Sequence, residues 1–433
     1  MTDSNLYHQV ALSLETLSSN SAGLSVALSG GVDSVVLLHL CQQYAKQQKV
    51  PLEAIYIDHG LSRNAKAWGD FCQRLCEQLA LPFQCASVSI EKKSRTSIEA
   101  QAREARYKAL DATAQPDFAI VLGQHGDDQL ETFLLRLKRG SGLLGLGAMQ
   151  AQVQLNSGRS CIRPMLGVSR AEIEAYAEQQ QLEHINDESN QDDSFDRNFL
   201  RQRIIPLLKA RFTGFLGASL RSIELLQRQQ AIIDEVSQQD LASCAHDQTL
   251  CIDALQALTP ARRDNVLRLW LAGYDVAMPS QKQLDDLVAQ ALSPRQDSQL
   301  KIQLGSGCIR RFRARLYYVT NSPQPEDLIE VNVAELTAYS RPLAITQGEG
   351  CRAPYDNEQV SVRFGRLNDK IKPCTKPGSN TIKHWLKDAG VPSWQRAHVA
   401  VVYYDAEPVA VVGHFVAAEF AQVDGIIWKY SND

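Results

Sequence analysis

Short apolar runs alternate with stretches of helical periodicity over the first 146 residues. Four runs have the length and β-branched content of buried strands: residues 25–29, 53–58, 82–90 and 117–123. Strands that alternate with helices favour parallel pairing, because a parallel connection must be long enough to hold a helix. The pattern predicts an α/β fold with a doubly wound parallel sheet in the N-terminal domain.

The helix that begins near residue 127 has two contrasting faces. Its predicted core stripe is apolar and comprises Leu130, Phe133, Leu134 and Leu137. Its other face carries charged side chains, which are Asp127, Glu131 and Lys138. This arrangement predicts that one side of the helix packs against the sheet while the other side is open for chemistry.

The rest of the chain has a different pattern. Residues 207–300 are mostly helical in periodicity, and residues 308–319 alternate like a strand. Residues 320–327 have the prolines and acids of a linker, and the last hundred residues mix short strands with one helix capped by Asn380. We therefore predict a catalytic domain, a mainly helical domain and a small α+β domain, at residues 1–206, 207–320 and 328–433.

The composition is that of an ordinary soluble protein. The 433 residues are 44% hydrophobic and 22% charged, and no apolar run reaches the length of a membrane span. The first residues lack the basic-then-apolar order of a secretion signal, so we expect a cytoplasmic location without membrane contact. Ten cysteines without a C-x-x-C pair indicate reduced thiols. The oligomeric state stays open, and a homodimer is one of the alternatives.

Two basic stretches stand out against a net charge of −4. Residues 197–211 hold five Lys or Arg and no acid, and residues 363–398 hold eight Lys or Arg and two Asp. A single basic run is usually a solvated face. Two separate runs on an acidic chain are less easily explained as solvated faces, so a nucleic-acid partner stays open despite the negative net charge.

A glycine-rich turn lies between the first predicted strand and the following helix. It consists of Ser29, Gly30, Gly31, Val32, Asp33 and Ser34. Consecutive glycines let the backbone approach an anion, and serine hydroxyls and the N-terminus of the helix add donors. An acid inside a phosphate cradle suggests a cation, so Asp33 is the predicted ligand of a Mg²⁺ ion that bridges to phosphate oxygens. The alternative is a plain strand-to-helix turn.

The turn lacks the patterns G-x-x-x-x-G-K-[ST] and G-x-G-x-x-G, which disfavours a kinase, a GTPase or a dinucleotide site. SGGVDS resembles the signature of the PP-loop ATP pyrophosphatase superfamily. Three further segments resemble the tRNA(Ile)-lysidine synthetase family: residues 123–142 (GQHGDDQLETFLLRLKRGSG), 187–208 and 379–396. This resemblance implies adenylylation of the wobble cytidine of the isoleucine tRNA with anticodon CAU, and its attack by free L-lysine, with release of AMP and pyrophosphate.

The chemistry that the resemblance implies can be assigned to residues. A departing pyrophosphate needs donors and cations, which the turn, Asp33 with Mg²⁺, and Lys138 or Arg139 would supply. A lysine amine has to lose a proton before it attacks, because its ordinary pKa is about 10.4. An acidic cluster and a histidine are suited to this proton transfer, and they comprise His125, Asp127, Asp128 and Glu131. The alternatives are a helix cap for the histidine and a favourable helix dipole for the acids.

Other residues are predicted to bind the substrates. His59 follows the second strand, and the resemblance implies that its loop lies near the adenosine. Residues 187–190 resemble a substrate-facing loop. Arg197 and Arg201 are predicted to reach the anticodon stem of the tRNA, and Lys383 and Lys387 are predicted to contact its phosphates. A polar loop and a solvated helix face are the competing interpretations.

Three other functions compete with this interpretation. A PP-loop tRNA thiolase would normally need paired cysteines or iron–sulfur ligands. An adenylylating small-molecule synthetase would not need two basic stretches. A tRNA-binding protein without activity would have no reason to keep both SGGVDS and HGDDQLET intact.

Overall fold

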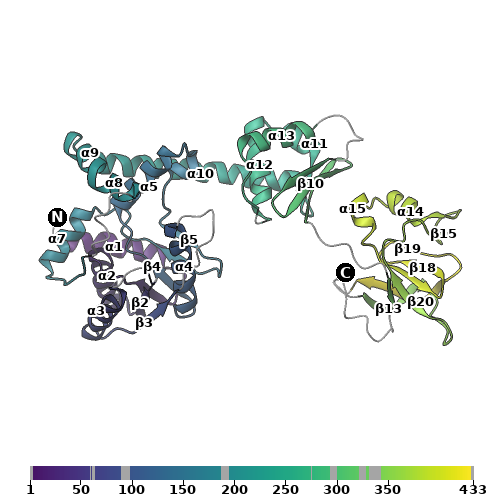
Figure 1. Ribbon diagram of the computed structural model, residues 1–433, viewed down its shortest axis with the longest axis horizontal. Helices are drawn as coiled ribbons and strands as arrows, with labels where there is room; N and C mark the ends of the chain where they lie inside the picture. The colour runs from purple at the N-terminus through teal and green to yellow at the C-terminus, as the bar shows by residue number, and fades with distance from the viewer. Residues whose placement is uncertain are drawn as a thin grey trace. The chain divides into compact units, whose positions relative to one another are not determined.

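The computed structural model describes residues 3–58, 60, 64–88, 98–186, 195–274, 276–292, 300–320, 328–330 and 343–430. The chain divides into two compact units, Met1–Val236 and Ser237–Asp433. Figure 1 shows the helices and strands of both units. No helix in the described part of the chain has both the length and the apolar character needed to cross a bilayer.

A six-stranded sheet forms the centre of the first unit (Figure 1). Its strands are β1 (Gly23–Ala27), β2 (Leu52–Asp58), β3 (Phe83–Ser87), β4 (Phe118–Val121), β5 (Gln152–Gln154) and β6 (Ser160–Ile162). They lie in the order β3-β2-β1-β4-β6-β5, and all neighbours are parallel except β5 and β6. The four strands that the sequence predicted are therefore present, and the predicted fold class is confirmed.

Helices flank this sheet and continue beyond it. Their bounds are α1 (Asp3–Leu17), α2 (Val32–Gln48), α3 (Ala65–Gln78), α4 (Ile98–Thr113), α5 (Gly126–Lys138), α6 (Leu143–Leu146), α7 (Arg170–Gln179), α8 (Asp196–Phe199), the π-helix η2 (Leu200–Ile204), α9 (Ile205–Arg211) and α10 (Phe215–Cys244). The central helix α2 is buried around most of its circumference, as its apolar sequence predicts.

The strand order places a binding crevice at one point of the sheet edge. From β1 the chain continues to β2 on one side, and β4 lies on the other side. In open α/β sheets, ligands bind beyond the carboxyl ends of the strands at such a switch in direction. The SGGVDS turn follows β1 and the GQHGDD segment follows β4, so both predicted motifs lie at this point.

The first half of the second unit combines helices with a five-stranded sheet. The helices are α11 (Ile252–Ala257), α12 (Pro260–Ala272) and α13 (Gln281–Ala291); the strands are β7 (Ala245–His246), β8 (Thr249–Cys251), β9 (Lys301–Leu304), β10 (Gly307–Phe312) and β11 (Arg315–Thr320). The prediction of one strand at 308–319 was wrong. Arg313 has a φ of 53°, and the chain turns there so that β10 and β11 pair antiparallel.

The second half of this unit is rich in short strands. Its elements are β12 (Leu328–Glu330), β13 (Leu343–Cys351), β14 (Val360–Arg363), β15 (Lys370–Ile371), β16 (Asn380–Thr381), α14 (Ile382–Asp388), α15 (Ser393–Arg396), β17 (Val401–Tyr404), β18 (Glu407–Val411), β19 (Phe415–Val416) and β20 (Ala421–Tyr430). The predicted cap Asn380 was wrong by one residue. Thr381 caps α14, because its hydroxyl accepts from the N–H of His384 while Asn380 lies in β16.

Candidate functional site

The SGGVDS turn joins β1 to α2 in a conformation that depends on glycine. Gly30 has a φ of +86°, and a Cβ at this position would lie 2.5 Å from the side chain of Ile185. The hydroxyl of Ser29 lies 3.2 Å from that of Ser34, which donates to the carbonyl of Gly31 at 2.9 Å. Because α2 begins here, its first N–H groups also lie at the turn, an arrangement that binds anions.

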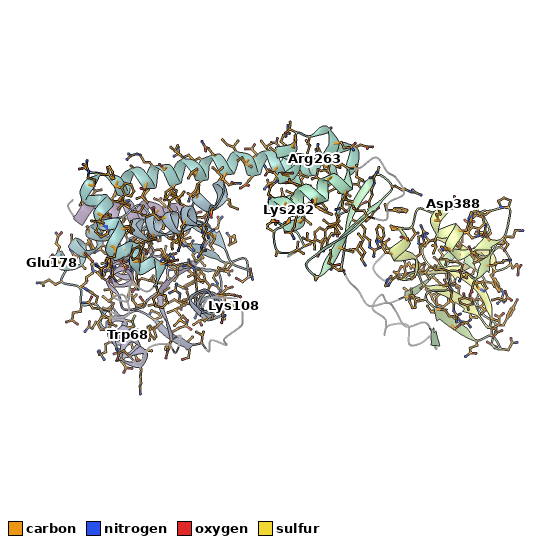
Figure 2. The ribbon with its side chains drawn as sticks, turned by 45° about the horizontal axis from the view of Figure 1, so that its top comes forward. Trp68, Lys108, Glu178, Arg263, Lys282 and Asp388 are labelled. Carbon is orange, nitrogen blue, oxygen red and sulfur yellow. The ribbon has the colours of Figure 1, made fainter. Side chains whose placement is uncertain are left out.

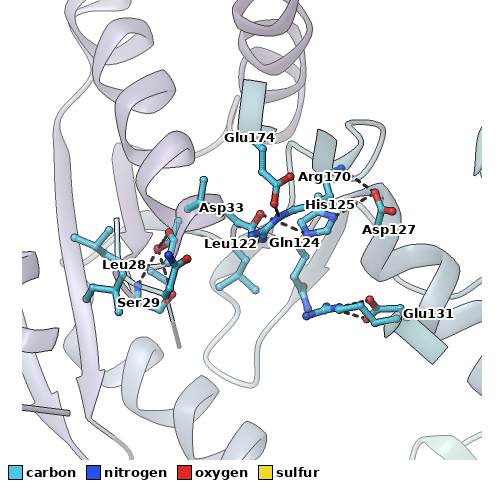
Figure 3. Close-up of a pocket in the computed structure, with 18 of the residues that line it drawn as sticks. Leu28, Ser29, Asp33, Leu122, Gln124, His125, Asp127, Glu131, Arg170 and Glu174 are labelled. Carbon is cyan, nitrogen blue, oxygen red and sulfur yellow. Dashed lines mark hydrogen bonds and ion pairs between the residues drawn. The ribbon is translucent and has the colours of Figure 1, made fainter. Parts of the chain in front are cut away.

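The GQHGDD segment packs directly against this turn (Figure 3). A Cβ at Gly123 would lie 3.3 Å from the backbone carbonyl of Asp33, so the two segments touch through the backbone. His125 is 3% exposed, and its Nε2 lies 3.5 Å from Asp33 Oδ1 and 3.5 Å from Asp128 Oδ2. His125 therefore links the turn to the acidic cluster.

Asp127 is held as an ionised carboxylate. It pairs with Lys209 of α9, and it accepts from the backbone N–H of Arg170 at 2.8 Å. Burial by itself would raise the pKa of Asp127, but the hydrogen bonds from Lys209 and Arg170 bring that pKa below its ordinary value. Asp127 thus anchors α7 and α9 to the start of α5.

Glu131 is buried, contrary to the predicted faces of α5. It is 1% exposed, whereas Leu137 of the predicted core stripe is 54% exposed. Arg201 donates from Nε to Glu131 Oε1 at 2.6 Å and from Nη2 to Oε2 at 3.0 Å. Burial raises the pKa of Glu131, and Arg201 opposes that rise. The pattern did not predict the burial of Glu131, which is possible because Arg197 and Arg201, about 60 to 70 residues later in the chain, supply compensating positive charge.

Arg197 and Arg201 both face the acidic cluster. Besides Glu131, Arg201 contacts Asp128 Oδ1 at 3.1 Å. Arg197 donates to Thr132 Oγ1 at 3.2 Å, and its Nε lies 3.4 Å from a Glu131 oxygen. These contacts position α8 and η2 beside α5, and of the two arginines Arg201 lines the cavity while Arg197 does not.

One cavity of about 1060 Å³ contains most of these groups. The acidic, basic and histidine side chains that line it are Asp33, Arg106, His125, Asp127, Glu131, Arg170, Glu174, Arg201 and Lys209. Apolar side chains of β2 and α4, and Trp68 of α3 (labelled in Figure 2), form another part of the wall. The cavity therefore joins an apolar region suited to a nucleoside with a polar region suited to phosphates.

Arg106 of α4 differs from the other cations of the cavity. Within the described residues it forms no hydrogen bond or ion pair, whereas Arg170, Arg201 and Lys209 each contact a carboxylate. Burial lowers the pKa of Arg106 from its ordinary value. Arg106 is therefore a lining arginine whose charge no described carboxylate pairs.

The structure does not bring every predicted residue to the cavity. Lys138 is exposed and pairs with Asp196 at 2.7 Å, and it does not line the cavity. His59 and residues 187–190 lie outside the described residues. Lys383 and Lys387 belong to the second unit, where both are exposed on α14. Near them Asp388, labelled in Figure 2, pairs with Lys376 at 2.8 Å.

Arg170 is one of the pocket residues that the sequence interpretation did not assign to the site, as are Glu174 and Lys209. It is the first residue of α7, directly after the N-cap Ser169, and a capping box with Glu172 fixes that helix start. The S-x-x-E signal was available in the sequence, since residues 169–172 read SRAE. What the sequence lacked was any sign that this helix begins beside Asp33.

Comparisons with known proteins identify the family of the chain. Residues 5–208 match the model of a PP-loop domain, residues 250–317 that of a TilS substrate binding domain, and residues 360–428 that of a TilS substrate C-terminal domain. A curated tRNA(Ile)-lysidine synthase of Serratia proteamaculans is 40% identical over 91% of both chains. The chain belongs to the tRNA(Ile)-lysidine synthase family.

Other members of the family are similar over comparable lengths. The tRNA(Ile)-lysidine synthase of Shigella flexneri is 40% identical over 92% of this chain and 93% of its own, and that of Vibrio vulnificus strain CMCP6 is 36% identical over 98% and 99%. The predicted family, fold class and ATP-dependent tRNA-modifying ligase class are therefore confirmed. The three domain boundaries and the roles of single residues stay predictions.

Proposed function

We propose that the chain attaches free L-lysine to the wobble cytidine of the isoleucine tRNA with anticodon CAU, in a reaction that converts ATP to AMP and pyrophosphate. The observation that supports this function best is a single cavity lined by both the SGGVDS turn and the acidic cluster. The turn is suited to hold phosphates, and the cluster is suited to hold and deprotonate an ammonium group.

In the first step the O2 atom of cytidine attacks the α-phosphorus of ATP. A bond forms between O2 and phosphorus, and the bond to the bridging oxygen breaks, so that pyrophosphate leaves with the electron pair. The hydroxyls of Ser29 and Ser34 and the N-terminus of α2 stabilise the developing negative charge. Arg106, which forms no ion pair within the described residues, is the cavity cation that we assign to the α-phosphate.

In the second step the ε-amine of lysine attacks C2 of the base. The carbon–nitrogen bond forms while the C2–O2 bond breaks, and AMP leaves with that oxygen. The ammonium group is first held by the acids of α5, and one of them takes the proton before the attack. Glu131 suits this exchange, because its raised pKa makes it a better proton acceptor than an ordinary carboxylate, and His125 can relay the proton.

Asp33 fits the predicted role of a Mg²⁺ ligand. Among the described residues its Oδ1 atom is buried and has no hydrogen-bond partner, so this carboxylate can accept one more contact. The described residues contain no cluster of three or more metal-ligating side chains. Mg²⁺ in nucleotide sites is held by one or two carboxylates together with the phosphates, so a protein cage is not required. Bound there, the ion would neutralise charge on the departing pyrophosphate.

The remaining assignments concern the partner RNA and the setting. Lys383 and Lys387 are exposed cations of a basic stretch, which supports contact with tRNA phosphates. Arg197 and Arg201 would meet the anticodon region where it enters the cavity. The enzyme would work in the cytoplasm, where tRNA and lysine are available. A homodimer stays a prediction that light scattering of the purified chain tests.

The variant Asp33→Ala tests the proposed function. It should abolish lysidine formation while tRNA affinity changes less than about twofold, because it removes charge at the turn and no predicted RNA contact. Asp234→Ala is the matched control, since Asp234 is an exposed carboxylate on α10 outside the cavity. Lysine incorporation into tRNA and filter binding are the two measurements. Normal turnover by Asp33→Ala would refute the assignment of the turn.

A further inference from the structure

Arg170 is fixed beside the SGGVDS turn by three separate contacts (Figure 3). Its backbone N–H donates to Asp127 at 2.8 Å, its Nη1 donates to Asp33 Oδ2 at 2.6 Å, and its Nε donates to Glu174 Oε1 at 2.7 Å. The segment before it is also anchored, because the N–H of Gly126 donates to the carbonyl of Val168 at 2.7 Å. The start of α7 therefore holds the guanidinium next to the turn.

The guanidinium is open to a ligand in the cavity. The side chain of Arg170 is 38% exposed and lines the cavity together with Asp33 and Glu174. Arg201 and Lys209 instead pair with acids of α5, namely Glu131 and Asp127. Among the described cations that line the cavity, Arg170 is thus the one that directly contacts a residue of the turn.

Bound phosphates and a bound cation would compete with the contact between Arg170 and Asp33. Phosphates seated on the turn would bring anionic oxygens within reach of the guanidinium, and a cation bound by Asp33 would take over that carboxylate. Glu174 would still hold Nε, so the two terminal nitrogens could rotate without loss of the side-chain anchor. Guanidinium groups bind phosphate oxygens through paired, charge-assisted hydrogen bonds.

We propose that Arg170 binds the β- and γ-phosphates of ATP and then the departing pyrophosphate, exchanging Asp33 for phosphate oxygens while Glu174 keeps the side chain in place. The inference rests on the proposed function only in taking pyrophosphate as the leaving group. A purely structural ion pair would instead stabilise the fold and leave the affinity for pyrophosphate unchanged.

Calorimetric titration of the full chain with pyrophosphate and with AMP, both with Mg²⁺, separates these roles. Arg170→Ala should weaken pyrophosphate binding about 10- to 100-fold, the loss expected for charge-assisted hydrogen bonds, and should change AMP binding less than about twofold. Arg228→Ala is the matched control, because Arg228 also pairs with a glutamate but lies on α10 outside the cavity. It should bind both ligands like the wild type.

Two results overturn the inference: unchanged affinity for pyrophosphate, or an equal loss for AMP and pyrophosphate. If Arg170→Ala lacks the circular dichroism of the folded chain, Arg170→Gln takes its place with the same expectation. A lysidine assay on the wild-type chain keeps the two proposals apart. If the variant loses pyrophosphate affinity selectively but the wild type forms no lysidine, only the proposed function is contradicted. If the wild type forms lysidine but the variant keeps its pyrophosphate affinity, only this inference is contradicted.

Discussion

Replacing Arg201 by methionine removes the main partner of a buried carboxylate. Glu131 is 1% exposed and accepts two hydrogen bonds from Arg201, while the nearest nitrogen of Arg197 is farther away at 3.4 Å. Methionine fills a similar volume without charge. The variant should therefore leave an ionised glutamate in a site with little water, which is costly for the folded state.

The loss of unfolding free energy in this variant depends on pH and has an upper limit. In the variant the pKa of Glu131 rises further in the folded state, so ionisation destabilises the fold as the pH climbs above the unfolded pKa of about 4.3. Protonation caps the penalty at about 1.36 kcal/mol per pH unit above that value, or about 3.7 kcal/mol at pH 7 and about 1 kcal/mol at pH 5. Because Arg197 remains, we expect a loss of about 2–3 kcal/mol at pH 7 and under about 1 kcal/mol at pH 5.

Urea unfolding followed by far-UV circular dichroism at both pH values measures this difference. The double variant Arg201→Met with Glu131→Gln is the control, since it removes the stranded charge and should restore stability at pH 7 to within about 1 kcal/mol of the wild type. The same destabilisation at pH 5 and pH 7 would refute the reasoning. So would a double variant as unstable as Arg201→Met alone.

Three further predictions concern other parts of the chain. Replacing both Lys383 and Lys387 by alanine should weaken tRNA binding and reduce the slope of log affinity against log salt concentration by about 1.8, because each lost phosphate contact removes about 0.9. Filter binding at several salt concentrations measures this slope, and an unchanged slope would mean that the two lysines are only solvated. Glu131→Gln should raise the KM for lysine more than the KM for ATP, and steady-state kinetics with the reverse order would reassign this residue to nucleotide binding. Glu53→Ala should lower the free energy of unfolding by about 3 kcal/mol or more, because buried Glu53 accepts hydrogen bonds from Ser25, Gln84 and the N–H of Gln115. The kcat at low temperature should stay unchanged. A Tm equal to that of the wild type would contradict this prediction.

The sequence predicted the N-terminal fold well because its signals are local. Parallel strands buried on both faces are continuous apolar runs, and the SGGVDS turn and GQHGDD segment each follow such a run. In a parallel sheet, motifs at the ends of strands meet at one edge, so the meeting of Asp33 with His125 could be anticipated.

Contacts between distant segments could not be anticipated from local patterns. Periodicity assigned Glu131 to an open face of α5, because a carboxylate is normally solvated and its partner Arg201 lies 70 residues later in the chain. The same holds for Arg170. The capping box predicts that Arg170 lies at the start of α7, but no local pattern predicts that this helix start lies beside Asp33. The turn at Arg313 was missed because a strand pattern continues on both sides of it.

The fate of ATP tests the central claim most directly. Purified chain would be incubated with ATP, Mg²⁺, labelled lysine and an isoleucine tRNA transcript with anticodon CAU, and the nucleotide products and the labelled tRNA would be counted together. We predict one AMP and one pyrophosphate for each lysine attached to the wobble cytidine. Formation of ADP and phosphate, or release of AMP without label in the tRNA, would contradict the account.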